Sequence, residues 1–313
     1  MNVVLAGEES AGLQLLHALA RTPHRVVAVL ATPPEGGSSE GRSSALSVWN
    51  AASDLGLQTW PAKLVRDPEL GGRLRSEKVD LLLNAHSLHT VHEQVLMAPG
   101  IGAFNLHPGP LPRYAGRNVV SWAIFRGESM HGVTVHRMEP QVDAGAIAYQ
   151  TLFTIEDKDT GLSLSLKCAR EGVALMLQLL RTAAVDPACI PRKPQDLSKR
   201  EYFGKDVPEE GRIRWSWPAR KVVDFVRACD FFPFSSPWRH PRTHLGAQEF
   251  SLVKARQTGL PCKIQPGTVG KSVDSGLHIA CQDEWILVSK LLISGKYIAA
   301  GELLKPGDRV TET

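Results

Sequence analysis

The first 31 residues alternate between strand-like and helix-like segments, and this order constrains the fold more than any other feature of the chain. Residues 2–6 form a short apolar run, residues 11–20 repeat leucine at helical spacing, and residues 25–31 form a second apolar run. Uninterrupted apolar runs are typical of strands that helices cover on both faces. The order strand, helix, strand therefore predicts a parallel sheet covered by helices.

The same pattern continues to about residue 182. Residues 34–44 are rich in Gly and Ser and predict a loop. The expected strands cover residues 79–84 and 102–107, with an antiparallel pair at 132–138 and 146–154, and the expected helices cover 45–55, 68–76, 121–127 and 162–182. The predicted class is α/β: a Rossmann-like, mostly parallel sheet with helices on both faces.

The amino-acid composition of the chain changes after residue 187. Residues 187–211 are rich in proline and charge, which indicates a connecting segment on the surface. After a short helix at 221–229, short strands separated by Gly and Pro turns follow, among them 249–255, 277–280 and 284–290, and these favour a smaller β-barrel-like (OB-like) domain. A length of 313 residues also favours two domains. We predict a catalytic domain at 1–188, a linker at 189–205 and a C-terminal β domain at 206–313.

Composition excludes several classes of protein. A net charge of +4 does not provide the dense basic face that nucleic-acid binding requires, and no apolar run approaches the length of a membrane helix. The chain starts directly in a strand-like segment without a basic leader, so we expect no signal peptide. Five scattered cysteines without a CxxC pair predict a cytoplasmic protein with reduced thiols.

Three polar residues form the most informative pattern in the sequence. Asn105 and His107 lie two residues apart at the end of a predicted strand, so their side chains project to the same side. Asp143 follows 36 residues after the histidine, in a predicted hairpin loop. Each residue alone is typical of a turn cap, a core histidine or a loop carboxylate. Together they predict a site at the carboxyl end of the sheet, where ligands of open α/β folds gather.

These side chains have the chemistry needed for acyl-type transfer. Asn105 offers an uncharged donor to an oxyanion, and His107 can donate or accept a proton near neutral pH. Asp143 could accept the proton of an attacking amine, directly or through water, or could favour protonated His107. No serine or cysteine stands in a nucleophile-elbow setting, so no covalent enzyme intermediate is required.

The pattern resembles the formyltransferases that depend on 10-formyltetrahydrofolate, a family that includes methionyl-tRNA formyltransferase and sugar N-formyltransferases. Its signature is an Asn-x-His-Pro core, a Leu-Pro-x-Tyr/His-x-Gly continuation, a Gly-x-Thr/Ser and a later Asp-x-Gly. Here these stand at residues 105–108, 111–116, 132–134 and 143–145. The resemblance implies that Asn105, His107 and Asp143 are catalytic and that 10-formyltetrahydrofolate is the cosubstrate.

We predict two sets of binding residues, and the resemblance implies the first of them. The folate is expected to lie against backbone groups near His86, Ser87, Leu88, Met138, Glu139 and Val142. The acceptor is expected near Tyr114, Arg117, Asn118 and Trp122. The signature loop departs from the family at Gly109-Pro110, where Ser-Leu is usual, and we interpret this as tolerated variation near the cosubstrate.

A second departure from the family pattern narrows the choice of acceptor. In the tRNA enzymes the loop after the second strand is basic, whereas residues 33–44 carry one arginine and two glutamates. Phosphate binding needs several cations, so we favour a small-molecule amine on a sugar nucleotide or an amino acid or peptide precursor. Methionyl-tRNA formyltransferase and 10-formyltetrahydrofolate hydrolase stay open as alternatives. We expect no nucleic-acid or membrane partner, and the oligomeric state is open.

Other candidate motifs are weaker. His86, His89 and His92 follow one another at spacings of three, whereas zinc-binding histidines on a helix usually stand four apart, so we expect no metal site. His136 is interpreted as an ordinary strand position. The turn that starts at Gly7 carries two glutamates, which disfavours phosphate binding and leaves a strand–helix turn with Ser10 as its N-cap.

Overall fold

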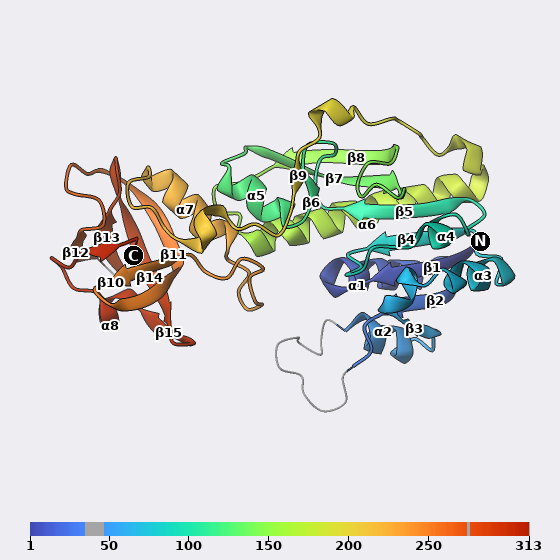
Figure 1. The fold of residues 1–313 in the computed structure, drawn as a ribbon, viewed down its shortest axis with the longest axis horizontal. Helices are drawn as coiled ribbons and strands as arrows, with labels where there is room; N and C mark the ends of the chain where they lie inside the picture. The colour runs from blue at the N-terminus through green and yellow to red at the C-terminus, as the bar shows by residue number, and fades with distance from the viewer. Residues whose placement is uncertain (35–46, 274–275, 313) are drawn as a thin grey trace. The chain divides into compact units, whose positions relative to one another are not determined.

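The computed structural model describes residues 1–34, 47–273 and 276–312, which divide into two compact units (Figure 1). Unit 1 comprises Met1–Arg117, Met130–Phe153 and Ser165–Phe203. Unit 2 comprises Asn118–Ser129, Thr154–Leu164 and Gly204–Thr313. Residues 35–44 of the loop predicted at 34–44 and residues 45–46 of the helix predicted at 45–55 lie outside the described residues.

Unit 1 is built on a seven-stranded sheet with the strand order β3-β2-β1-β4-β5-β7-β8. The strands from β3 to β5 pair in parallel, and β7 runs antiparallel to β5 (Figure 1). The strand bounds are β1 Asn2–Gly7, β2 Arg25–Ala31, β3 Thr59–Pro61, β4 Leu81–Ala85, β5 Gly102–His107, β7 Met130–Arg137 and β8 Ile147–Thr154.

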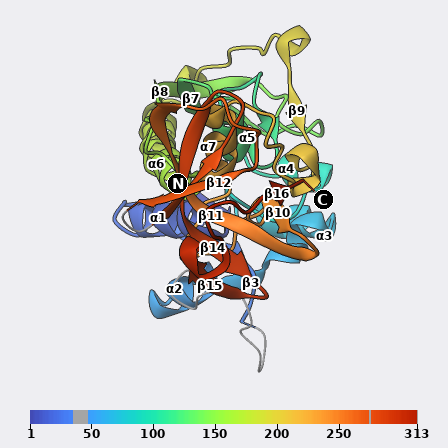
Figure 2. The same cartoon turned by 90° about the vertical axis from the view of Figure 1, so that its left-hand side faces the viewer.

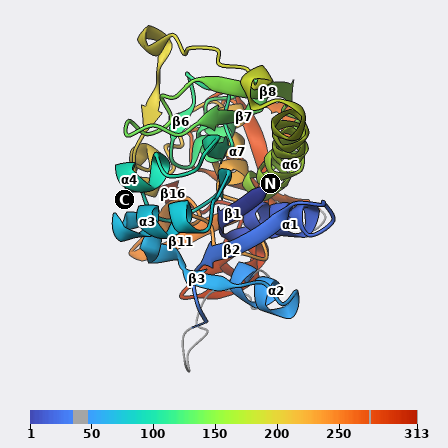
Figure 3. The same ribbon diagram turned by 90° about the vertical axis from the view of Figure 1, so that its right-hand side faces the viewer.

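Helices cover both faces of this sheet. Successive residues of a strand point to opposite faces, so a strand made of apolar residues contributes side chains to a core on each face. Figure 3 shows α1, α2 and α6 on one side of the sheet and α3 and α4 on the other. Val3 and Leu5 of β1 belong to the core shared with α1, α2 and α6, and Val4 and Ala6 belong to the core shared with α3 and α4. The helix bounds are α1 Glu9–Leu19, α2 Val48–Asp54, α3 Glu69–Ser76, α4 Glu93–Leu96 and α6 Gly161–Val185, with 3-10 helices at Ala62–Arg66, Pro187–Cys189 and Leu197–Lys199.

The start of α1 differs from the prediction. The N-cap is Glu8, without a side-chain cap, and Ser10 lies inside the first turn, so the prediction of Ser10 as the cap was wrong. The backbone N–H of Glu8 donates to the Ala85 carbonyl, which fixes the turn at the carboxyl end of the two central strands β1 and β4. The Glu8 carboxylate is occupied elsewhere, because its Oε1 accepts from both the N–H and the hydroxyl of Thr32 at 2.6 Å.

A short additional pairing joins two distant parts of unit 1. β6 (Ala115–Gly116), just after the signature loop, pairs in parallel with β9 (Tyr202–Phe203). The rings of Tyr114 and Phe203 are stacked with their centroids 5.3 Å apart. The end of the proline-rich segment that the sequence presents as a connector therefore packs against the signature loop.

Unit 2 contains an antiparallel sheet with the order β12-β13-β14-β11-β10-β16, and β15 pairs with β14 (Figure 2). The bridge between Thr268 and Arg309 joins the chain beside β12 to the chain beside β16, so the two ends of the strand order meet as in a barrel. The elements are β10 Arg242–Leu245, β11 Gln248–Pro261, β12 Val269–Val273, β13 Gly276–Ala280, β14 Glu284–Ile293, β15 Lys296–Ala299, β16 Val310–Thr311, α5 Val119–Phe125, α7 Ala219–Ala228, α8 Ala300–Leu303 and a 3-10 helix at Pro208–Gly211.

Both halves of the predicted fold class are confirmed: a mainly parallel sheet between helices, and a smaller antiparallel β unit. The strand expected at 102–107 is β5, with the same bounds. The predictions missed the short strands β3, β6 and β9 of unit 1 and β10, β12, β15 and β16 of unit 2. Such strands lack the alternation that reveals longer ones.

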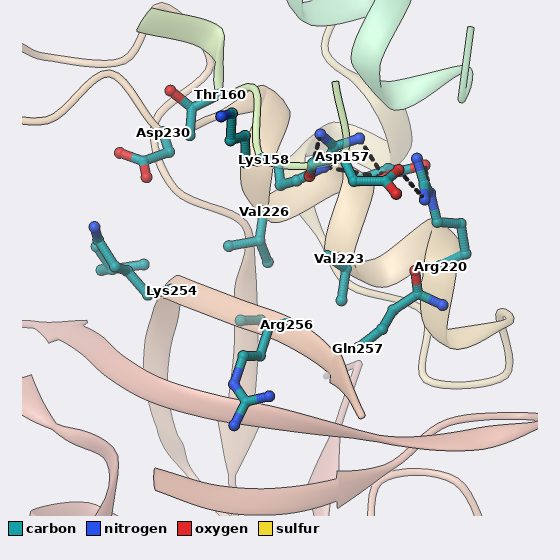
Figure 4. Close-up of a pocket in the computed structure, with 14 residues that line it drawn as sticks. Asp157, Lys158, Thr160, Arg220, Val223, Val226, Asp230, Lys254, Arg256 and Gln257 are labelled. Atoms are coloured by element: carbon teal, nitrogen blue, oxygen red, sulfur yellow. Dashed lines mark hydrogen bonds and ion pairs between the residues drawn. The ribbon is translucent and has the colours of Figure 1, made fainter. Parts of the chain in front are cut away.

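A buried ion pair fixes α7 within unit 2. The Asp224 side chain is 2% exposed and accepts from Arg227 at 2.7 Å and from Arg220 at 2.9 Å. Arg227 also donates to the carbonyls of residues 156, 157 and 159. A cavity of about 430 Å³ lies between this network and β11, and Figure 4 shows Arg220, Asp157 and the β11 side chains along its wall.

Three further features bear on the predicted class of protein. Within the described ranges, no helix combines the length and apolar character needed to cross a membrane. The same residues contain no group of three or more His, Cys, Asp or Glu side chains arranged to hold a metal ion. All five cysteines are free thiols.

Candidate active site

The end of β5 positions the first two candidate residues. Asn105 and His107 lie on the same side of the strand, and β5 pairs with β7 in a register that sets Asn105 opposite His136 and His107 opposite Thr134. Residues directly opposite in an antiparallel pair share a face of the sheet. Four polar side chains therefore converge at the carboxyl end of β5, beside the first antiparallel neighbour of the parallel strands.

His107 is held by its own signature loop. Its Nε2 bonds to the carbonyl oxygen of Tyr114, and because a carbonyl only accepts, Nε2 carries the hydrogen. Its Nδ1 lies 3.5 Å from Asp143 Oδ2. The side chain is 4% exposed, and burial lowers its pKa below 6.5 although the neighbouring Asp143 opposes that shift. His107 is therefore neutral at pH 7, with the Nδ1 lone pair directed toward the carboxylate side.

The Asp143 loop is fixed from two sides. Asp143 has a left-handed backbone (φ 56°), and its Oδ2 accepts the backbone N–H of Gly116 at 2.8 Å. Gln195, from the proline-rich segment, donates through Nε2 to the carbonyls of Asp143 at 3.0 Å and Gly145 at 2.7 Å. A left-handed non-glycine residue costs free energy and persists where its surroundings determine it, as at many functional sites.

The Asp143 carboxyl is ionised throughout the physiological range. Burial alone raises its pKa, but the neighbouring His107 and His136 and the Gly116 N–H together lower the pKa well below its usual range. The carboxylate is 7% exposed, so water screens it little. It therefore provides a permanent negative charge beside the imidazole of His107.

Thr134 fixes the loop between His107 and Tyr114. Its hydroxyl donates to the Gly109 carbonyl at 2.7 Å and accepts from the Leu111 N–H at 3.2 Å. Gln150 of β8 donates to the same hydroxyl oxygen at 2.8 Å. One side chain on β7 thereby fixes a loop that is already stiffened by prolines.

Position 109 has no room for a side chain. A Cβ atom there would lie 2.6 Å from the Tyr114 carbonyl oxygen and 2.9 Å from His107 Nε2, the two atoms that hydrogen-bond to each other. The departure from the family's usual serine is thus coupled to how His107 is held. Sequence reasoning interpreted Gly109 only as tolerated variation.

His136 is the main site residue that sequence reasoning missed. Its Nε2 lies 3.1 Å from Asn105 Nδ2 and 3.5 Å from Asp143 Oδ1, so it stands between two members of the predicted trio. The available signal was the alternation along β7, which places Thr134 and His136 on one face. Without the β5–β7 register, that face could not be assigned to the site.

The residues predicted to border the folate lie in two loops of unit 1. Residues 86–88 follow β4 directly, and residues 138–142 follow β7. His86 has a left-handed backbone, and its exposed side chain pairs with Glu9 at 3.5 Å. Ser87 is half-buried, and its N–H donates to Asn84 Oδ1. Leu88 is 40% exposed.

In the second loop, Met138 is half-buried, and its backbone N–H donates to the carbonyl of Ala103 on β5. Glu139 and Val142 are exposed, and the Val142 carbonyl accepts from Arg200 at 2.9 Å. This loop leads directly into Asp143. Its backbone is therefore fixed next to the carboxylate.

The four predicted acceptor residues have different environments. The Tyr114 ring is 1% exposed, so Tyr114 contributes its carbonyl to His107 while its ring belongs to the core. Arg117 is exposed, and its backbone N–H donates to the Phe203 carbonyl. In unit 2, Asn118 caps α5 and the half-buried Trp122 packs edge-to-face on Trp238 at 5.0 Å.

The fold and the site define an α/β enzyme in which an imidazole, a carboxylate and a carboxamide meet at the carboxyl end of the sheet. The chain belongs to the formyl transferase family: the model of the formyl transferase domain matches residues 1–180. The model of the formyl transferase C-terminal domain matches residues 207–307. The protein is therefore a formyltransferase.

Solved structures share this fold at low sequence identity. The N-formyltransferase from Helicobacter canadensis, solved with folinic acid and dTDP-3-aminofucose, is 17% identical with a TM-score of 0.66, over 91% of this chain and 98% of that chain. The sugar 3N-formyltransferase WlaRD is 16% identical with a TM-score of 0.65, over 95% and 98%. HypX from Aquifex aeolicus is 19% identical with a TM-score of 0.64, over 97% of this chain and 47% of its own longer chain.

Proposed function

We propose that this protein transfers a formyl group from 10-formyltetrahydrofolate to an amine of a small molecule, a sugar nucleotide or an amino acid or peptide precursor. The observation that carries the proposal is the buried cluster in which His107 Nδ1 faces the Asp143 carboxylate and the Asn105 carboxamide lies on the same face of β5. These groups match the three needs of formyl transfer: proton removal, charge stabilisation and oxyanion binding.

In the proposed reaction the acceptor nitrogen attacks the formyl carbon and forms a new C–N bond. The neutral His107 takes the amine proton at Nδ1, because Nε2 is committed to the Tyr114 carbonyl. The Asp143 carboxylate stabilises the imidazolium that results. An N–H of Asn105 stabilises the oxyanion. The bond to the donor nitrogen then breaks, and that nitrogen receives the proton.

The loops beside the site fit a folate. The loop after β4 exposes the apolar Leu88, and the loop that leads into Asp143 exposes the apolar Val142 and is held by the backbone of β5. Apolar side chains beside fixed backbone groups suit the flat faces and polar edge of a pterin ring. Family membership supports the same donor, as do similar folds solved with folinic acid, 5-N-formyl-THF or tetrahydrofolic acid.

The strongest support for a small-molecule acceptor is the low positive charge of the loop that follows the second strand. Residues 33–44 contain one arginine and two glutamates, which does not suit a tRNA acceptor stem. Similar folds include an enzyme solved with dTDP-3-aminofucose. A small amine is therefore favoured over initiator tRNA, and a sugar nucleotide is the first candidate.

The test is an acceptor panel with 10-formyltetrahydrofolate as donor. The purified chain is incubated with a dTDP-linked 3-amino sugar, a UDP-linked amino sugar, free amino acids or charged initiator methionyl-tRNA, and N-formyl products are measured by mass spectrometry. Formylation of a small amine is the expected result. Formylation of the tRNA alone would overturn the acceptor assignment.

A second arm omits every acceptor and measures formate. Water in place of the amine would make the protein a hydrolase of the same donor. Release of formate at a rate equal to the fastest rate with any amine would contradict the transferase proposal. Slow release that is suppressed when an amine is formylated would agree with it.

A further inference from the structure

His136 stands at the centre of the candidate site, although the proposed reaction assigns it no step. It lies on β7 directly opposite Asn105 and is 2% exposed. A buried imidazole whose two nitrogens both face polar groups is constrained in its tautomer. The neighbours of the ring set that constraint.

The Nδ1 atom of His136 lies 2.8 Å from the carbonyl oxygen of Arg137. A carbonyl oxygen only accepts, so Nδ1 carries the hydrogen and donates it. In the neutral ring, Nε2 then has a free lone pair and must accept. The group it accepts from is the Asn105 amide, with Nδ2 at 3.1 Å.

This bond sets the orientation of the Asn105 carboxamide. If the amide were turned over, its oxygen would face the lone pair of His136 Nε2, and two acceptors would stand against each other. With the observed orientation, one N–H of Asn105 points to His136. The second N–H has no protein partner among residues 1–34, 47–273 and 276–312, so it is available to a ligand.

Asp143 does not compete for this bond. Its Oδ1 lies 3.5 Å from His136 Nε2, which is longer than the 3.1 Å from Nε2 to Asn105 Nδ2 and outside the usual range of N–H···O bonds. A proton on Nε2 would change the arrangement, because the ring would then donate to Asp143 and face the Asn105 N–H with a hydrogen. The shorter contact to Asn105 therefore fits a ring with its hydrogen on Nδ1 and a lone pair on Nε2.

We infer that His136 is a positioning residue, which holds the Asn105 amide so that its second N–H is directed at the reacting formyl oxygen. The inference deepens the proposed function and rests on it for the role of Asn105. A misdirected donor weakens the transition state more than the bound substrates. The effect should therefore fall on kcat and leave the half-saturation concentration of the folate nearly unchanged.

The kinetic test compares H136L with H136Q. Leucine removes the acceptor, whereas the glutamine carbonyl can take the place of Nε2 and accept from Asn105. With 10-formyltetrahydrofolate and a dTDP-linked 3-amino sugar, H136L should lower kcat at least about tenfold, and H136Q should recover most of that loss. H278Q, which replaces a buried histidine of unit 2, is the matched control and should retain wild-type kcat. Equal kcat for H136L and the wild type would overturn the inference.

A second measurement does not depend on turnover. In protein labelled with ¹⁵N-histidine, two-bond ¹H–¹⁵N spectra report the tautomer of each imidazole, and H136Q identifies the signals of residue 136. The expected pattern at pH 7.5 is a hydrogen on Nδ1 and none on Nε2. The Nε2 resonance should move when Asn105 is replaced by Leu, because its donor is lost.

The two measurements separate the inference from the proposed function. A wild type that formylates no amine, with the expected tautomer and the expected response to N105L, would contradict the proposed acceptor class and leave the His136–Asn105 bond established. A hydrogen on His136 Nε2 would overturn the inference, and so would an Nε2 resonance that has the same chemical shift in N105L as in the wild type. Either result would do so at any measured kcat.

Discussion

The backbone N–H of Gly116 donates to Asp143 Oδ2 at 2.8 Å, across 27 residues of sequence. This bond joins the signature loop, which holds His107, to the loop that carries the carboxylate. The distance from that oxygen to His107 Nδ1 is 3.5 Å. The pairing of imidazole and carboxylate therefore depends on backbone contacts as much as on the two side chains.

Substitution of Gly109 by Ser is expected to damage the site, although serine is usual there in the family. The new Cβ would lie 2.6 Å from the Tyr114 carbonyl oxygen and 2.9 Å from His107 Nε2, so one partner of their hydrogen bond must move. We expect a loss of about 1–3 kcal/mol in the free energy of unfolding and at least about a tenfold loss in kcat.

The matched control is G72A, because a Cβ at Gly72 in α3 meets nothing within 4 Å. Alanine in a helix is favoured over glycine, so G72A should be as stable as the wild type or more so. Urea unfolding and steady-state kinetics on both variants decide the matter. Wild-type kcat in G109S would refute the coupling between position 109 and His107.

Replacing Gln195 by Ala should loosen the Asp143 loop from a distance. The side chain donates to two carbonyls of that loop, and loss of both bonds should cost about 1 kcal/mol and lower kcat severalfold. The exposed Gln58 is the comparison residue, since Q58A removes only a surface contact. If Q195A and Q58A have equal kcat, the loop is fixed without Gln195.

The pH dependence follows from the lowered pKa of His107. Because the folded-state pKa lies below 6.5, the unfolded chain binds more protons than the folded one at pH values between the two, and stability is lost as pH falls below 6.5. H107Q should show a shallower loss than the wild type when urea unfolding is followed from about pH 7.5 to about pH 5.

The rate of turnover should also fall as the pH is lowered. The neutral imidazole accepts the amine proton, so the acid limb of the kcat/KM profile, which reports the free enzyme, should lie below pH 6.5, the ordinary pKa of histidine. The Asp143 carboxylate stays ionised over this range and adds no limb of its own. An acid limb centred above pH 6.5 would contradict the assignment of His107 as the base.

In unit 2, D224A should cost about 3–5 kcal/mol of stability, because it leaves the buried guanidinium of Arg227 without its carboxylate. D157A is the matched control: it removes the exposed carboxylate that pairs with Arg220 and should leave the unfolding midpoint close to the wild type. A midpoint for D224A equal to that of D157A would show that the buried pair does not stabilise unit 2.

The sequence predicted the elements whose signals are local. The strand at 102–107, the amphipathic helix near 162–182 and the trio of Asn105, His107 and Asp143 follow from periodicity and motif spacing. What it could not predict depends on register and long-range contacts. His136 joins the site only because β7 pairs with β5 as it does, and Gln195 reaches the Asp143 loop from 52 residues away.

Ser10 shows that a local residue preference can be overridden by a tertiary contact. It has the residue type of a helix cap, yet the helix begins earlier because the Glu8 backbone bonds to the sheet. Gly109 is similar, since its meaning depends on a contact between His107 and Tyr114 that no local pattern encodes. Tertiary contacts decide such positions, and a single sequence does not contain them in readable form.

The central claim is that the charge of Asp143 supports proton transfer by His107 during formyl transfer. Its most direct test is D143N, with D54N as a control at an exposed aspartate of α2. Tetrahydrofolate formation is measured with an acceptor that the wild type uses, and 5-formyltetrahydrofolate binding is measured by calorimetry. We predict at least about a 100-fold loss of kcat in D143N, with folate affinity preserved and D54N unaffected. Wild-type kcat in D143N would contradict the account.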